Sequence, residues 1–125
     1  MDFNTLLKPS ISEVNAFVKR NAQNVAIVGD LRAARDVCKT KEARAKIEAL
    51  ILPMQKQLQK ECAAFDAKMS SIWKKTKGEK IPDDVQKKLN GALESGTKTM
   101  KSKNGPEVKH NSDTGHNRWI DVQSF

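Results

Sequence analysis

The sequence predicts an all-α fold: a helical hairpin or small helical bundle with one long helix, a short third helix and an extended C-terminal tail. Apolar residues recur at steps of three and four over residues 11–28 and again over 47–72, which is the helical period. The composition agrees, because 5% of residues are aromatic, Tyr is absent, and Ala, Val, Ile, Leu and Met supply most apolar groups. At 125 residues the chain is one small domain with a tail, which we divide into a helical domain over 1–94 and a basic, polar tail over 95–125.

The first helix is predicted to begin at Ser10. A serine followed three residues later by Glu13 has the spacing of a capping box. The polar Asn21 fills a gap in the apolar row, whose members are Ile11, Val14, Val18, Val25 and Val28. This row predicts a helix with one buried stripe.

Residues 24–36, "NVAIVGDLRAARD", could form either a phosphate-binding turn between a strand and a helix or ordinary helix. A dinucleotide turn needs several glycines, and a phosphate loop needs a Lys followed by Ser or Thr; this segment offers only Gly29. The rest of the sequence offers no convincing partner strand. We therefore predict helix, with Gly29 and Asp30 as a potential break at which Asp30 caps a new helix over 31–38.

The second helix, over about residues 41–75, has the strongest pattern. Its apolar stripe consists of Ile47, Ile51, Met54, Leu58, Cys62, Phe65, Met69 and Ile72, and Trp73 continues it. Pro53 removes one backbone donor, but the stripe runs through it without a change of register. One continuous, kinked helix is therefore favoured over two helices.

A third helix is predicted over residues 81–95, with Pro82, Asp83 and Asp84 in its first turn. Residues 95–118 are polar and without periodicity, which predicts a flexible tail. The tail ends in an apolar segment that contains Arg118, Trp119, Ile120, Val122 and Phe125. Docking on a partner ranks first for this segment, folding back on the helices second and stacking on nucleobases third.

The charge is strongly basic, with 23 Lys and Arg against 15 Asp and Glu, a net charge of +8 and a pI near 9.6. Such a chain is attracted to nucleic acid, anionic membranes or acidic protein surfaces. Residues 68–88 hold seven lysines and three acidic residues, a net +4, and a second basic group lies near residue 40. The candidate nucleic-acid or polyanion contacts are Lys39, Lys41, Arg44, Lys46, Lys74, Lys75, Lys77, Lys80, Lys87 and Lys88. The alternative for both groups is a solvated surface that confers solubility.

The sequence predicts no catalytic, metal or cofactor site. Cys38 and Cys62 lie far apart in the chain, and His110 and His116 lie in the tail, so the close ligand pairs of structural zinc are missing. The same placement gives a cysteine nucleophile no base, and a disulfide between the two cysteines is not expected. With no signal peptide and no membrane span, we expect reduced thiols in a cytoplasmic protein.

Two functional hypotheses remain. The first is a non-catalytic binding protein for nucleic acid or another polyanionic assembly, motivated by the basic groups. The alternative is a structural or adaptor subunit of a larger, for example viral or oligomeric, complex. That subunit would dock an acidic or other protein partner through the helical stripe and the C-terminal segment, and it could form a homo-oligomer through the stripe.

Overall fold

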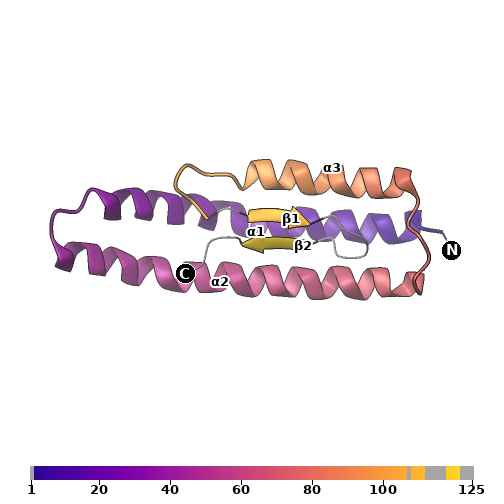
Figure 1. Ribbon diagram of the computed structural model, residues 1–125, viewed down its shortest axis with the longest axis horizontal. Helices are drawn as coiled ribbons and strands as arrows, with labels where there is room; N and C mark the ends of the chain where they lie inside the picture. The colour runs from indigo at the N-terminus through magenta and orange to yellow at the C-terminus, as the bar shows by residue number, and fades with distance from the viewer. Residues whose placement is uncertain (1, 107, 112–117, 122–125) are drawn as a thin grey trace.

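The computed structural model describes residues 2–106, 108–111 and 118–121. It contains helices α1 (Asn4–Asp36), α2 (Lys41–Trp73) and α3 (Asp83–Thr99), the short 3-10 helix η1 (Lys74–Thr76), and strands β1 (Val108–Asn111) and β2 (Arg118–Asp121). Figure 1 shows α1 and α2 as an antiparallel pair, with α3 alongside one half of it. The all-α prediction, with a helical hairpin, one long helix and a short third helix, is confirmed.

Helix α1 begins at Asn4, so the predicted start at Ser10 is wrong. Asp2 caps the helix instead, since its Oδ1 accepts from the Asn4 backbone N–H at 3.0 Å. The helix starts early because Leu6 and Leu7, each 7% exposed, extend the buried stripe upstream of Pro9. Ser10 lies inside the helix, and its Oγ donates to the Leu6 carbonyl at 2.8 Å.

Helix α1 also continues through Gly29 and Asp30 without a break. The prediction of helix over residues 24–36 is confirmed, and the potential new cap at Asp30 is wrong. The polar Asn21 is buried as its place in the stripe requires, and its Nδ2 donates to the Phe17 carbonyl at 2.9 Å. One 33-residue helix therefore replaces the two pieces that Gly29 suggested.

Helix α2 begins at the predicted residue and runs unbroken through Pro53 for 33 residues. Thr40 caps it, because its Oγ1 accepts from the Ala43 backbone N–H at 3.2 Å. The predicted stripe faces inward: its buried members are Ile51, Leu58, Cys62, Phe65 and Met69. Trp73 is 4% exposed and belongs to the core as predicted. The other three members of the predicted stripe, Ile47, Met54 and Ile72, are half-buried.

Helix α3 extends to Thr99, beyond the predicted end at Ser95. Gly96 in this extra turn and Met100 directly after the helix are both buried, so the extra turn contributes to the core. The segment after α3, residues 101–106, then crosses α1. Asn104 has a positive φ of 64°, a conformation that asparagine tolerates, and its carbonyl accepts from Arg32 Nη1 at 3.4 Å.

The core lies where three helices meet. The rings of Phe17 on α1 and Phe65 on α2 lie 5.3 Å apart at 58°, and Leu89 and Leu93 of α3 are 0% exposed. Helix α1 packs against both α2 and α3, whereas within the described residues no Cα of α2 comes within 8 Å of a Cα of α3. The two strands contact these separated helices: β2 packs on α2, and β1 packs on α3 (Figure 1).

The sequence predicts neither strand, and both lie in its predicted flexible tail. They form an antiparallel ladder in which Val108 pairs with Asp121 and His110 with Trp119. Four-residue, largely polar strands carry too little alternation to be recognised, and a lone hairpin needs packing to persist. Here α2 and α3 provide that packing.

Candidate nucleic-acid interface

The first predicted basic group surrounds the turn between α1 and α2. Its members Lys39, Lys41, Arg44 and Lys46, here the tip cluster, are all exposed. Arg44 Nη2 donates to the Cys38 carbonyl at 3.4 Å, which ties α2 back to the turn. Arg32 and Arg35 on the last turns of α1 extend the group. The tip, residues 32–47, thus carries six basic and two acidic residues, a net +4.

The second group lies in the connection between α2 and α3. Lys74, Lys75, Lys77 and Lys80, here the loop cluster, are all exposed, and residues 74–82 hold one acidic residue, Glu79, which leaves a net +3. The connection has a defined shape: η1 closes α2, and the buried Thr76 donates from Oγ1 to the Trp73 carbonyl at 2.8 Å. Lys77 then adopts a left-handed conformation, with φ of 51°. The lysines are therefore displayed on ordered backbone.

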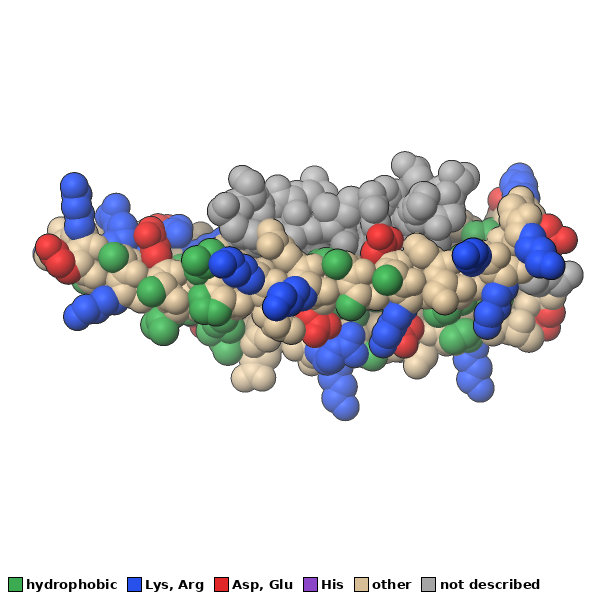
Figure 2. All heavy atoms as spheres, turned by 90° about the horizontal axis from the view of Figure 1, so that it is seen from below, with side chains coloured by type: hydrophobic (Ala, Val, Ile, Leu, Met, Phe, Trp, Pro, Cys, Tyr) green, Lys and Arg blue, Asp and Glu red, His purple; other side chains and the backbone are tan. Residues whose placement is uncertain are grey.

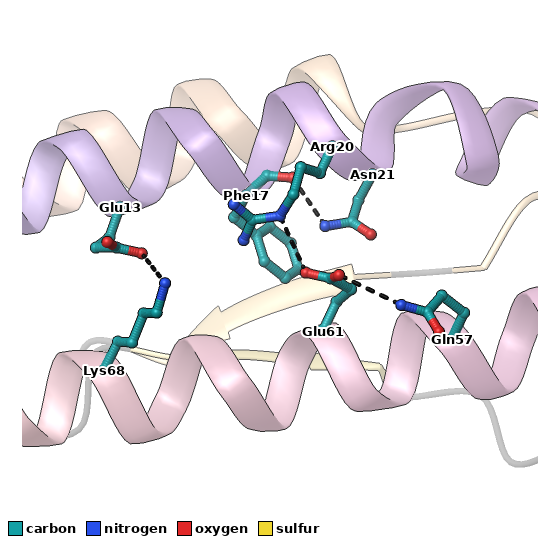
Figure 3. Close-up of polar contacts among 7 residues, drawn as sticks. All are labelled: Glu13, Phe17, Arg20, Asn21, Gln57, Glu61 and Lys68. Atoms are coloured by element: carbon teal, nitrogen blue, oxygen red, sulfur yellow. Dashed lines mark hydrogen bonds and ion pairs between the residues drawn. The ribbon is translucent and has the colours of Figure 1, made fainter.

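The helix residues in the middle of the α1–α2 pair carry no net charge. Residues 13–31 and 48–73 contain five basic and five acidic residues. Some pair across the two helices: Arg20 Nε lies 3.2 Å from Glu61 Oε2, and Lys68 Nζ lies 3.4 Å from Glu13 Oε2 (Figure 3). The chain's +8 is thus concentrated, because the tip and the loop end together carry +7.

The structure separates the two clusters instead of joining them into one surface. They lie at opposite ends of α2, whose 33 residues span about 50 Å. Figure 2 shows Lys and Arg side chains at both ends of the molecule, and side chains of both signs of charge along its whole length. Lys87 and Lys88 are exposed on α3, whose three basic and three acidic residues cancel.

The segment after α3 brings two further lysines beside α1, and the sequence pattern alone does not predict this position. Lys101 and Lys103 are exposed, and the Lys103 carbonyl lies close to Gly29. The one available signal is Gly29 itself, since an isolated glycine inside a helical pattern often marks the close approach of another backbone. Gly29 thus indicates that another backbone segment comes close to the helix, but it does not identify that segment.

The predicted docking residues fall partly within the described chain. Arg118, Trp119 and Ile120 form most of β2, whose backbone packs on α2. Val122 and Phe125 lie outside the described residues. The backbone of this segment has therefore folded back on the helices, which is the second-ranked interpretation of Trp119.

The cysteines and histidines do not converge in the described part of the chain. Cys38 and Cys62 are not joined by a disulfide, and Cys38 Sγ donates to the Ala34 carbonyl at 3.3 Å. Among the described residues no three His, Cys, Asp or Glu side chains lie close enough together to hold a metal ion. His110 lies in β1, and His116 lies outside the described residues.

In comparisons with protein-family models, with curated proteins and with solved structures, the chain matched none of them. None of the helices, as far as the chain is described, combines the length and apolar character needed to cross a membrane. A functional conclusion must therefore come from the distribution of charge and apolar surface.

Proposed function

We propose that this protein is a non-catalytic, elongated binding protein that associates with nucleic acid through its two basic ends. The observation that carries the proposal is the placement of +7 of the net +8 charge in two short segments at the ends of the α1–α2 pair. Lysine and arginine clusters bind phosphates by charge and release counterions, so the affinity they give is independent of sequence and sensitive to salt. A cytoplasmic location is part of this proposal.

The positions of the tip residues support a binding role. Positive charge at a helix N-terminus opposes the helix dipole, and Lys41 and Arg44 stand at the start of α2. Only Glu42 in the first turn has the favourable sign. At the start of α2 the helix dipole therefore does not favour these positive charges, whereas a polyanion would gain from them.

The ion-pair pattern points the same way. Within the described part of the chain, none of the ten candidate lysines and arginines takes part in an ion pair, whereas Arg20, Arg35 and Lys68 each do. Exposed, unneutralised charges of one sign attract a polyanion. The competing interpretation, a surface that serves only solubility, predicts that no such binding occurs.

Fluorescence anisotropy with a labelled 24-base-pair duplex tests the proposal. With three or four phosphate contacts at an end, the affinity should fall about 40- to 150-fold between 50 and 200 mM salt. The variants K39Q/K41Q/K46Q and K74Q/K75Q/K80Q each remove the lysine contacts of one end, and the sixfold variant that combines them should reduce both the affinity and its salt dependence. The variant K19Q/K56Q/K60Q removes three exposed lysines from the middle and serves as the matched control. Absence of binding by the wild-type protein at 50 mM salt would exclude the proposal.

A second function, a subunit of a larger protein assembly, is supported by exposed apolar side chains. Ile27, Leu50 and Leu52 are 37%, 59% and 44% exposed, in the part of α1 and α2 that α3 does not cover. The ion pairs Glu13–Lys68 and Arg20–Glu61 show the register of the two antiparallel helices: seven residues forward along α1 correspond to seven residues back along α2. Seven residues further along α1, Ile27 therefore lies opposite Met54. This flank, on which Leu50 lies one turn before Met54, changes from ionic to apolar toward the tip.

The molar mass in solution tests the second function in its homo-oligomeric form. If the flank joins copies of the chain, light scattering should give a dimer or larger species, and L50Q should shift the mass toward the monomer. Leu50 is 59% exposed, so its replacement should leave the fold intact. A monomeric wild-type protein at high concentration would restrict this function to docking of a different protein partner, through this flank or the C-terminal segment.

A further inference from the structure

The two basic ends point away from each other along the molecule. The tip cluster lies at the reversal between α1 and α2, and the loop cluster lies at the connection from α2 to α3. These chain reversals close opposite ends of the α1–α2 pair (Figure 1). The distance between them, about 50 Å along α2, corresponds to about 15 base pairs of duplex.

The section between the ends is poorly suited to lie along a phosphate backbone. Among the helix residues there, five acidic residues balance five basic residues, and Glu13 and Glu61 hold Lys68 and Arg20 in ion pairs. Lys101 and Lys103 beside α1 add positive charge to this section. Asp30 and Glu48 add two exposed carboxylates to this section, and phosphates that approach them are repelled. Attraction is therefore strongest when each end meets its own duplex.

The absence of aromatic residues from both ends favours double-stranded over single-stranded nucleic acid. Proteins that hold single strands stack bases on aromatic side chains, and neither residues 32–47 nor residues 74–82 contain an aromatic residue. The adjacent Trp73 is 4% exposed and cannot offer its ring face. Lysine and arginine alone contact the phosphates of a duplex without reading its sequence.

We infer that one molecule binds two separate nucleic-acid duplexes, one at the tip cluster and one at the loop cluster, and bridges them at a spacing of about 50 Å. The inference rests on the proposed nucleic-acid binding and adds its geometry. The rigid pair of 33-residue helices fixes the spacing, since no break interrupts α1 or α2. Lys101 and Lys103, beside α1, belong to neither end.

A capture assay with two short duplexes tests the bridge. One 12-base-pair duplex is tethered to a surface and a second, labelled one is in solution; at about 40 Å each is too short to reach both ends of one molecule. At low salt the wild-type protein should retain the labelled duplex, and a large excess of protein should abolish retention by saturating each duplex separately. K19Q/K56Q/K60Q should retain it as the wild type does.

The two end variants give the decisive comparison. K39Q/K41Q/K46Q and K74Q/K75Q/K80Q should each still bind the tethered duplex, weakened by about twofold because one of two sites remains, and each should fail to capture the labelled duplex. Capture by either variant would overturn the bridge. Wild-type binding to the tethered duplex without capture would also overturn it and leave the proposed function standing. Absence of binding to any duplex would remove both.

Discussion

Gly29 lies two turns before the end of α1, where the segment after α3 crosses the helix. A Cβ at this position would lie 2.7 Å from the Lys103 carbonyl oxygen and 2.8 Å from Ser102 Oγ. On the other side of the contact, a Cβ on Gly105 would lie 3.1 Å from the Val25 carbonyl oxygen. Two glycines thus let the backbone of residues 102–105 lie directly on α1.

Replacing Gly29 by alanine should therefore destabilise the protein. Overpacking against a backbone carbonyl costs about 1–3 kcal/mol, which exceeds the gain of about 1 kcal/mol that alanine brings to a helix interior. Gly91 of α3 is the matched control, since a Cβ there meets nothing within 4 Å, and Gly91→Ala should stabilise by about 0.5–1 kcal/mol. Urea unfolding measures both changes, and effects of the same sign would contradict the close approach at Gly29.

The interior of each helix was predictable from the sequence, whereas the first and last residues of the helices were less predictable. The stripe of α2 repeats at three and four residues over more than seven turns, and no other structure satisfies that period. The start of α1 was missed because a capping box is a local pattern, and Leu6, Leu7 and the Asp2 cap outweigh it. The strands could not be predicted, since their pairing depends on the surfaces of α2 and α3.

The same distinction applies to the candidate interface. Both basic clusters were visible in the sequence because their lysines are close neighbours along the chain. Their separation depends on where the chain reverses, at residues 37–40 and 74–82. The pairing of charges in the middle, such as that of Arg20 with Glu61, joins residues 41 apart and follows from the register of α1 against α2.

The cap of α2 gives the prediction for a single helix. Thr40 is extended, with φ of −118° and ψ of 151°, and its Oγ1 accepts the Ala43 N–H at the start of the tip cluster. Thr40→Ala should destabilise the protein by about 1 kcal/mol because this N–H loses its partner, whereas Thr40→Ser should retain the stability. Thermal unfolding compares the two, and equal stability of Thr40→Ala and wild type would contradict the cap.

In the whole molecule, the C-terminal part of the chain connects α2 and α3, which do not pack on each other directly. Helix α1 touches both of its neighbours, while α2 and α3, as far as both are described, have no Cα atoms within 8 Å of one another. The β1–β2 ladder packs on both of them. Just before it, Met100 is 2% exposed and Pro106 is buried, so core residues continue past the predicted boundary at residue 94.

Truncation should therefore weaken the molecule in two steps. A chain of residues 1–106 loses the ladder and should unfold at a lower temperature than the full chain, because the surfaces of α2 and α3 beneath the ladder become exposed. A chain of residues 1–94 also loses Met100, a loss worth about 2–5 kcal/mol if it resembles a buried Met→Ala change. Met100→Ala in the full chain is the matched control for that step. Circular dichroism melts should rank the full chain above 1–106 and 1–106 above 1–94. Equal melting temperatures for the two truncated chains would make residue 94 a true boundary of the helical domain.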